Sequence, residues 1–330
     1  MTLSATVAPI APGAGTPTGT VQFVDVTTSQ VLCTPSPTLT SIGGVWEATC
    51  NTSALTQGSQ TQSITATYSG DGNFATSTSN PQFQSVFGTQ ISVVNSAGYT
   101  SSNFSPNSFA TIYGQNLAYT QLSASVTPWP TSLSGTTVLV TDSTGTARLA
   151  PLLYVSLSQI NFGIPANTAY GLATVTVTNA SGETASAIIL ITVTAPGLFS
   201  ENGNGQGVAA GYLITVHADG TQSPQSPLFQ FNPNLNPGQY VPIPIVWNSA
   251  TDLQYLVLYG TGIRNGASNV TATINGISVP VLYSGPQPQF ADEDQVNIGP
   301  IPQSLKGAGS VNIVITVNGQ ASNTVTVSIQ

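Results

Sequence analysis

The sequence predicts an all-β protein of three tandem β-sandwich domains, the last two of which are related by an internal duplication. Short segments of alternating apolar and polar residues recur along the chain between Gly- and Pro-rich turns, a pattern of strands rather than helices. One unit of sequence occurs twice. Pro151-Leu152-Leu153-Tyr154 and Gln159-Ile160-Asn161-Phe162-Gly163 return as Pro280-Val281-Leu282-Tyr283 and Gln295-Val296-Asn297-Ile298-Gly299.

The first predicted domain covers residues 1–88. We expect its strands at 2–7, 20–26, 44–50 and 62–68, and the turns between them are rich in proline, glycine, aspartate and asparagine, as turn geometry favours. Short, evenly spaced strands of this kind pack as two sheets face to face.

The second predicted domain, 89–194, and the third, 195–330, each hold one copy of the repeated unit. In the second domain, the apolar run at 185–194 predicts a strand buried on both faces. The third domain begins with a Pro- and Gly-rich lead-in at 195–250. In its body, the Asn-Gly pairs at 275–276 and 318–319 predict tight hairpins.

The composition excludes several classes of partner. Only 4% of residues are charged, and three basic residues stand against eleven acids, for a formal net charge of −8. Such a surface cannot neutralise a phosphate backbone, so we exclude nucleic acid. The longest apolar run, 187–193, is far shorter than the roughly 20 residues that span a bilayer, so no membrane insertion is expected. A neutral surface rich in hydroxyl and amide groups instead suits a secreted or cell-surface protein. Residues 1–20 show no signal peptide, so we expect a mature product or a fragment of a longer protein.

The two cysteines, Cys33 and Cys50, flank Trp46 within the first predicted domain. A Gly43-Gly44 turn joins the segments that carry them and would place them on neighbouring strands. Two thiols are too few for a structural zinc site. We therefore predict one local disulfide, which stabilises the fold by about 3 kcal/mol for a loop of that size.

Residues 1–80 resemble the bacterial Ig-like repeat of large surface proteins. The resemblance rests on Gly19-Thr20-Val21-Gln22-Phe23, Thr52-Ser53-Ala54-Leu55 and Tyr68-Ser69-Gly70-Asp71-Gly72-Asn73-Phe74-Ala75. The resemblance implies that this sandwich is Ig-like. With it, the predicted fold class is three tandem Ig-like β-sandwich domains. That family carries a further strand before the segment that matches 2–7, so the resemblance implies either a truncated sequence or a sandwich that lacks a strand which another segment or molecule supplies.

Residues 91–330 resemble the uncharacterised C-terminal domain family named for Solibacter. The motifs are Val94-Asn95-Ser96-Ala97, the two Gln-x-Asn segments, Ala195-Pro196-Gly197-Leu198-Phe199 and Ala218-Asp219-Gly220-Thr221. The family sits at the ends of long secreted or surface proteins and has no assigned activity. The resemblance therefore implies a fold and a location but no reaction.

Catalytic residues are scarce. The single histidine, His217, lies on an expected strand, and no G-x-S-x-G elbow occurs, so we expect a structural histidine and no enzyme. The acidic cluster Asp292-Glu293-Asp294 places Asp292 and Asp294 on one side of an extended segment, where they would form a Ca²⁺ site or a solvated loop. A secreted hydrolase would require these two carboxylates to meet a cleft. No other cofactor is expected.

Two further features are considered as ligand sites. The glycine-rich stretch 202–207 lacks the lysine and the helix of a phosphate loop. Trp129, between two prolines, and Trp247 would stack on sugars if exposed, or else would plug a domain junction.

We therefore expect a non-enzymatic extracellular structural or adhesive protein. In the sharper form of this hypothesis, a neighbouring copy completes the sandwich by strand complementation and so builds a filament. The residues of the expected inter-subunit strands are Thr2, Leu3, Ala5, Val7, Val325, Val327 and Ile329. The partners would be copies of this chain or other surface proteins. The alternative is a carbohydrate-binding or spacer module of a larger secreted enzyme or adhesin, with glycans as partners.

Overall fold

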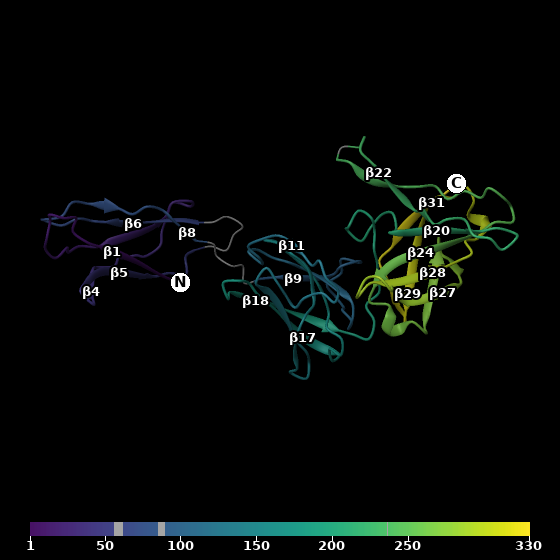
Figure 1. Cartoon of the computed structure of the whole chain (residues 1–330), viewed down its shortest axis with the longest axis horizontal. Coiled ribbons are helices and arrows are strands. Elements are labelled where there is room, and N and C mark those ends of the chain that lie inside the picture. The colour runs from purple at the N-terminus through teal and green to yellow at the C-terminus, as the bar shows by residue number, and fades with distance from the viewer. Residues whose placement is uncertain (56–61, 85–89, 236) are drawn as a thin grey trace. The chain divides into compact units, whose positions relative to one another are not determined.

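The computed structural model describes residues 1–55, 62–84, 90–235 and 237–330 and shows an all-β protein (Figure 1). Its described residues form strands and two short 3₁₀ turns, η1 (Arg264–Gly266) and η2 (Gln303–Leu305). None of the described helices is long and apolar enough to cross a membrane. The chain divides into two compact units, Met1–Thr89 and Gln90–Gln330, and each is described by itself below.

The N-terminal unit is a sandwich of two antiparallel sheets. One sheet has the order β1 (Thr2–Val7), β5 (Val45–Asn51), β4 (Thr40–Ile42). The other has the order β3 (Gln30–Val31), β2 (Val21–Asp25), β6 (Gln62–Tyr68), β7 (Ser77–Thr78), and β8 (Gln82–Gln84) also pairs with β6. Alternate residues of the inner strands, such as Val21 and Phe23, fill the core between the sheets.

A disulfide and a hydrogen-bonded turn stabilise this unit. Cys33 and Cys50 form a disulfide across 17 positions of sequence. Asp71 accepts hydrogen bonds from the backbone N–H groups of Thr18, Asn73 and Phe74 and from the hydroxyls of Thr18 and Tyr68. The Tyr-Ser-Gly-Asp-x-Asn-Phe signature is therefore a turn in which the aspartate accepts hydrogen bonds from the backbone N–H groups of the same loop.

In the C-terminal unit, residues 91–194, here called the first repeat, form two antiparallel sheets. The first has the order β11 (Leu122–Ser123), β15 (Leu152–Val155), β16 (Gln159–Gly163), β10 (Phe109–Tyr113), β9 (Ser92–Asn95). The second has the order β12 (Ser132–Leu133), β13 (Thr136–Thr141), β17 (Gly171–Thr178), β18 (Thr184–Ile191), with β14 (Ala147–Leu149) against β13.

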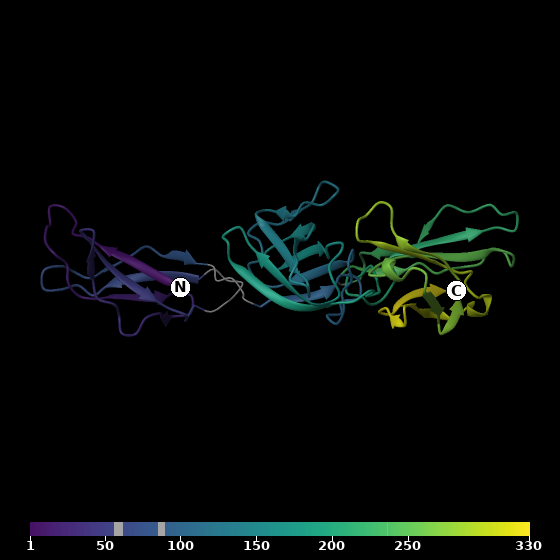
Figure 2. The ribbon, with the colours of Figure 1, turned by 90° about the horizontal axis from the view of Figure 1, so that it is seen from below.

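Residues 195–330, here called the second repeat, form the same two sheets. The first has the order β21 (Ser226–Pro227), β20 (Gly211–Val216), β24 (Leu253–Thr261), β28 (Asp294–Ile298), β27 (Val281–Pro286), with β19 (Gly197–Leu198) against β24. The second has the order β26 (Ile277–Val279), β25 (Val270–Ile274), β29 (Gly309–Val317), β30 (Gln320–Ala321), and β31 (Val325–Ile329) also pairs with β29. Figure 2 separates the layers of this repeat. The hairpin β22 (Phe229–Asn232) and β23 (Gln239–Pro242) projects from its body (Figure 1).

The duplication predicted from the sequence extends to register. In the first repeat, β15 pairs with β16 with an irregularity between Leu152 and Tyr154. In the second repeat, β27 pairs with β28 with the same irregularity between Val281 and Tyr283. Because this β-bulge occurs at the same place in both copies, it is a regular part of the repeated unit rather than a local defect. The division of this unit into separate domains at residue 194 stays a prediction.

Two expectations about strands are wrong. The strand predicted at 185–194 is not buried on both faces, because β18 lies at the end of its sheet and Ile188 is 71% exposed. Val325, Val327 and Ile329 do not form a free inter-subunit strand, because they are buried in the core of the second repeat. The other edge of β31 is also occupied, by isolated bridges to residues 208 and 245.

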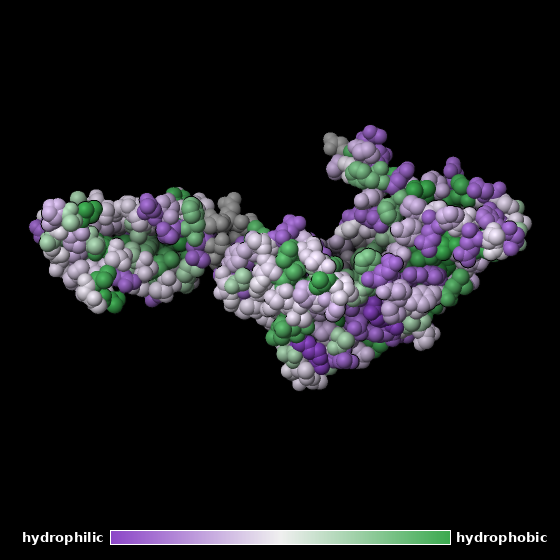
Figure 3. Space-filling view, viewed as in Figure 1, coloured by the Kyte–Doolittle hydropathy of each residue, from purple (hydrophilic) through white to green (hydrophobic). Residues whose placement is uncertain are grey.

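The surface has little charge, as the composition requires. The face shown in Figure 3 is mostly pale, because residues of intermediate hydropathy cover it between scattered green and purple side chains. The polar groups of this surface are therefore mostly hydroxyls and amides rather than charged groups.

Candidate ligand-binding cleft between the two repeats

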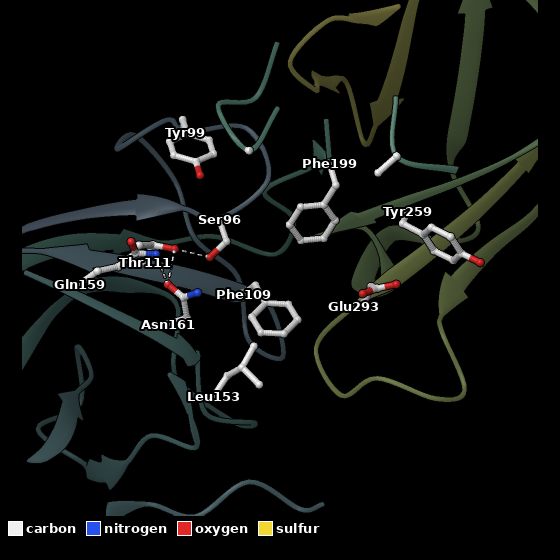
Figure 4. Close-up of a pocket in the computed structure, with 12 residues that line it drawn as sticks. Ser96, Tyr99, Phe109, Thr111, Leu153, Gln159, Asn161, Phe199, Tyr259 and Glu293 are labelled. Carbon is white, nitrogen blue, oxygen red and sulfur yellow. Dashed lines mark hydrogen bonds between the residues drawn. The ribbon is translucent and has the colours of Figure 1, made fainter. Parts of the chain in front are cut away.

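A cleft of about 360 Å³ lies between the two repeats of the C-terminal unit (Figure 4). The outer face of the first repeat's β9-β10-β16-β15 sheet forms one wall, and the second repeat forms the other. The cleft is lined by Ser96, Tyr99, Phe109, Thr111, Leu153, Gln159, Asn161, Phe199, Gly203, Ala210, Tyr259 and Glu293.

Strand alternation places the Gln-x-Asn motif on the wall of this cleft. Ile160 and Phe162 of β16 point into the sandwich and are fully buried. Successive side chains of a strand point to opposite faces, so Gln159 and Asn161 point outward into the cleft.

A chain of hydrogen bonds orients the polar wall. Gln159 Nε2 donates to Asn161 Oδ1 over 2.8 Å, and Thr111 Oγ1 donates to the same oxygen over 3.3 Å. Because a hydroxyl has one proton, Thr111 accepts the hydrogen bond that joins it to Ser96 Oγ at 2.8 Å. The amide nitrogen of Asn161 consequently faces Phe109 (Figure 4), as a fixed donor to a ligand.

Aromatic side chains from both repeats meet across the cleft. The rings of Phe109 and Phe199 are 6.3 Å apart between centroids and cross at 76°. Tyr259 lies farther along the second-repeat wall, where Tyr212 supports it edge to face at 6.2 Å. These edge-to-face contacts hold the rings in fixed orientations.

The position of Phe109 is fixed by the second repeat. Its backbone N–H donates to Thr261 Oγ1 over 2.7 Å, and that hydroxyl donates to the backbone oxygen of Asp292 over 2.8 Å. Nearby, Asn265 Nδ2 donates to Pro106 O over 2.9 Å. The cleft is therefore built on a hydrogen-bonded junction of the two repeats.

Two groups at the cleft have raised pKa values. Burial, with a smaller effect of the Asp294 charge, raises the pKa of Glu293 to about 7. Burial and the neighbouring Tyr113 raise the pKa of Tyr99 to about 12. At neutral pH, Tyr99 is thus a neutral phenol, and Glu293 can donate as well as accept a hydrogen bond.

The two carboxylates predicted to share Ca²⁺ have different partners in the structure. Asp294 pairs with Arg264, whose Nε lies 2.6 Å from Asp294 Oδ1, and accepts the backbone N–H of Ile263 over 2.6 Å. The Asp292 carboxylate lies against Gly163 of the first repeat. Among the described residues, no group of three or more His, Cys, Asp or Glu side chains forms a metal site. The pair does not line the cleft, where Glu293 is the carboxylate instead.

The tryptophans predicted to stack on sugars occupy different surroundings. Trp129 is half-buried and packs on Phe109, with ring centroids 5.0 Å apart. It therefore adjoins a cleft residue. Trp247 packs on the core of the second repeat, and Lys306 Nζ lies 5.2 Å from its ring centroid. A cation already occupies that face, so Trp247 offers less surface to a sugar.

His217 belongs to a hydrogen-bonded row that sequence reasoning did not anticipate. Its Nδ1 lies 3.0 Å from Asp252 Oδ1, and its Nε2 lies 2.8 Å from Ser223 Oγ. This is the order of atoms in a Ser-His-Asp triad. The backbone N–H of Ser223 is already bonded to Thr215 O, however, and residue 224 is a proline without an N–H. Neither amide can then bind an oxyanion, and the row closes the hairpin after β20.

In the N-terminal unit, a groove of about 410 Å³ follows β1. Here called the β1 groove, it is lined by Thr2, Leu3, Ser4, Ala5, Thr6, Phe23, Ile64, Ala66, Ser79, Asn80, Gln82, Phe83 and Gln84. In the described residues, β1 is the end strand of its sheet. Of the β1 residues expected in an inter-subunit strand, Thr2, Leu3 and Ala5 line this groove and Val7 does not. Their role between subunits stays a prediction.

The sequence analysis missed most of the cleft residues. The available signal was the outward alternation of Gln159 and Asn161 in a motif that the chain repeats. Phe109 and Phe199 gave no comparable signal, because they are brought together only by packing of the two repeats. The acidic cluster that contains Glu293 is visible in the sequence, but its alternation favours Asp292 and Asp294 as the candidate residues.

Comparison with known proteins identifies one segment. Residues 1–87 match the family of bacterial Ig-like domains (group 3), which confirms the resemblance seen for this part of the chain. The resemblance of residues 91–330 to the Solibacter-type family stays a prediction. No curated protein matches the chain.

Several solved structures are similar at low identity. The chain is similar to the Bacteroides ovatus mixed-linkage glucan utilization locus SGBP-B in complex with a mixed-linkage heptasaccharide, at 12% identity over 99% of this chain and 70% of that one, with a TM-score of 0.30. It is similar to Dpr2 Ig1-Ig2 in complex with DIP-Theta Ig1-Ig3, at 10% identity over 100% and 92%, with a TM-score of 0.23. It is also similar to murine CEACAM1b, at 11% identity over 73% and 100%, with a TM-score of 0.16. At these scores the likenesses carry no argument about a ligand.

Proposed function

We propose that this chain is a non-enzymatic extracellular adhesive module whose cleft between the two repeats binds a neutral glycan. The observation that carries the proposal is the pairing of oriented aromatic rings with a fixed row of amide and hydroxyl groups in one cleft.

The chemistry of the cleft matches that of an uncharged sugar. Aromatic faces such as Phe199 pack against the C–H surface of a sugar ring, and the amides and hydroxyls of Asn161 and Ser96 bond its hydroxyl groups. The volume, about 360 Å³, lies in the range of small-molecule sites, about 300–1,000 Å³. No lysine or arginine lines the cleft, so it has no cation to select an anionic sugar or a phosphate.

Binding is tested by isothermal titration of the full chain with neutral gluco-, manno- and galacto-oligosaccharides. Phe199→Ala is expected to raise the Kd of the bound sugar about tenfold, from loss of one aromatic contact. The control is Tyr170→Ala, because Tyr170 is 55% exposed and lies outside the cleft. Absence of binding to every oligosaccharide, or equal losses in the two variants, would reject the proposal.

A second candidate function is strand acceptance by the β1 groove, which would join neighbouring copies into a filament. Met1 exchanges both backbone hydrogen bonds with Thr52. Because such pairs alternate along antiparallel strands, Leu3 and Ala5 bond β5. The N–H and C=O groups of Thr2 and Ser4 point to the other edge of β1, where no strand of the described residues pairs with it. The groove residues are all uncharged, so a neutral extended strand of another copy would fit.

Ser4→Pro tests this second function, since it removes an N–H from the free edge and keeps the bonds to β5. Sedimentation velocity and negative-stain microscopy of the full chain are expected to show concentration-dependent assembly that Ser4→Pro abolishes. A strictly monomeric wild-type chain at high concentration would exclude the filament and leave the glycan proposal untouched.

A further inference from the structure

The duplication repeats the cleft wall as well as the fold. The register of β10 with β16 pairs Thr111 with Asn161, and the register of β24 with β28 pairs Val257 with Asn297. Counting along these strands makes Phe109 equivalent to Tyr255. The bulge residues of the two copies, Leu153 and Leu282, are equivalent in the same way.

All four equivalent positions of the second repeat line one pocket of about 300 Å³. Its lining includes Tyr255, Val257, Leu282 and Asn297. The amide orientation is also repeated, because Gln295 Nε2 donates to Asn297 Oδ1 over 2.9 Å, as Gln159 does to Asn161 over 2.8 Å. The second repeat therefore presents an aromatic ring, a leucine and an oriented asparagine in the arrangement of the first.

The remaining walls of the two pockets differ. The first cleft is closed by Phe199, Tyr259 and Glu293 of the following repeat. The second pocket instead takes Ile214, Val216 and Gln222 from β20 and the turn after it. Leu282 is 61% exposed there, and Val257 replaces the hydroxyl of Thr111. The second pocket thus keeps the base of the first cleft and lacks its opposing aromatic wall.

We propose that the pocket of Tyr255, Leu282 and Asn297 is a second site for the same neutral glycan, so that one chain binds two sugar segments. This inference rests on the proposed glycan function. Loss of the opposing aromatic contacts makes the second site weaker than the first by about tenfold or more in Kd. Gln222 and the Tyr255 hydroxyl supply the polar groups that replace Ser96 and Thr111.

The experiment is a titration of the full chain with the neutral oligosaccharide that binds the first cleft. Wild type is expected to show two sites per chain, one tight and one weak. Leu282→Asp places a charge in the exposed second pocket and is expected to leave only the tight site. Phe199→Ala is expected to weaken the tight site alone. Ile277→Asp is the control, because Ile277 is 40% exposed on β26 in the other sheet.

The outcomes separate the two proposals. A stoichiometry of one that Leu282→Asp does not change would overturn the second site and leave the first intact. Failure of every neutral oligosaccharide to bind would overturn both. A weak site lost in Leu282→Asp and kept in Ile277→Asp would establish the second pocket.

Discussion

The carboxylate of Asp292 occupies the space that a β-carbon on residue 163 would need. Gly163 ends β16 of the first repeat, and Asp292 precedes β28 of the second repeat. The absence of a side chain at 163 is therefore a condition for the two repeats to meet and for the cleft beside them to form.

Gly163→Ala is predicted to lower the free energy of unfolding of the C-terminal unit by about 1–3 kcal/mol, the usual cost of overpacking. The added carbon collides with Asp292 and comes within 3.1 Å of Pro151. Chemical denaturation measures the change. The double variant Gly163→Ala, Asp292→Gly removes the obstructing carboxylate, and Asp292 has a φ of 61° that suits glycine. If the loss in the double variant equals the sum of the losses in Gly163→Ala and in Asp292→Gly alone, the packing argument is contradicted.

The C-terminal unit is predicted to be more stable at pH 5 than at pH 8. Burial raises the pKa of Asp292 to about 6 and that of Glu293 to about 7, whereas both titrate near pH 4 in an unfolded chain. The folded state therefore holds protons that the unfolded state has released. The stability from these groups is fully present below about pH 4 and is lost as pH rises through about 7.

Thermal unfolding across pH 5 to 8 in the presence of a chelator measures this dependence. Glu293→Gln keeps the shape of the side chain and removes its charge, so its Tm is expected to vary less with pH. The hydrogen bonds and ion pair that lower the pKa of Asp142 affect stability only at lower pH, outside this window. A wild-type Tm that rises from pH 5 to pH 8 would refute the prediction.

Sequence patterns predicted the parts of this molecule that depend on local order. The repeat of Pro151-Leu152-Leu153-Tyr154 predicted two copies of one unit, and the Asn-Gly pairs at 275–276 and 318–319 predicted the turns between β25 and β26 and between β29 and β30. The strand at 185–194 was misjudged, because an apolar run does not reveal whether a second layer covers its outer face. Ile188 is exposed for this reason.

The cleft was not predictable in the same way. Phe109 and Phe199 are far apart in the sequence, and neither lies in a motif that indicates a ligand. Their contact depends on hydrogen bonds such as that from Phe109 N–H to Thr261. The alternation of apolar and polar residues does not predict a hydrogen bond of this kind. The row of Ser223, His217 and Asp252 was missed for the same reason.

Reduction of the Cys33–Cys50 disulfide is predicted to destabilise only the N-terminal unit. The bond closes a loop with a sequence separation of 17, and a loop of that size contributes about 3 kcal/mol. Denaturant unfolding with and without dithiothreitol measures the loss. The double variant Cys33→Ser, Cys50→Ser is expected to match the reduced wild type. A shift in the unfolding of the C-terminal unit would show that the disulfide acts elsewhere.

Ser223 is predicted not to be a nucleophile, although its hydroxyl bonds His217 as in a hydrolase. A serine hydrolase stabilises the oxyanion with backbone N–H groups at or next to the nucleophile. The N–H of Ser223 bonds Thr215 O, and Pro224 has none. A fluorophosphonate probe is therefore expected to leave Ser223 unlabelled.

Ser223→Ala is expected to lower the free energy of unfolding by about 1 kcal/mol, the usual net value of one hydrogen bond. It should leave the titration of both glycan sites unchanged. Labelling of Ser223 that His217→Ala abolishes would instead make this hairpin an active site.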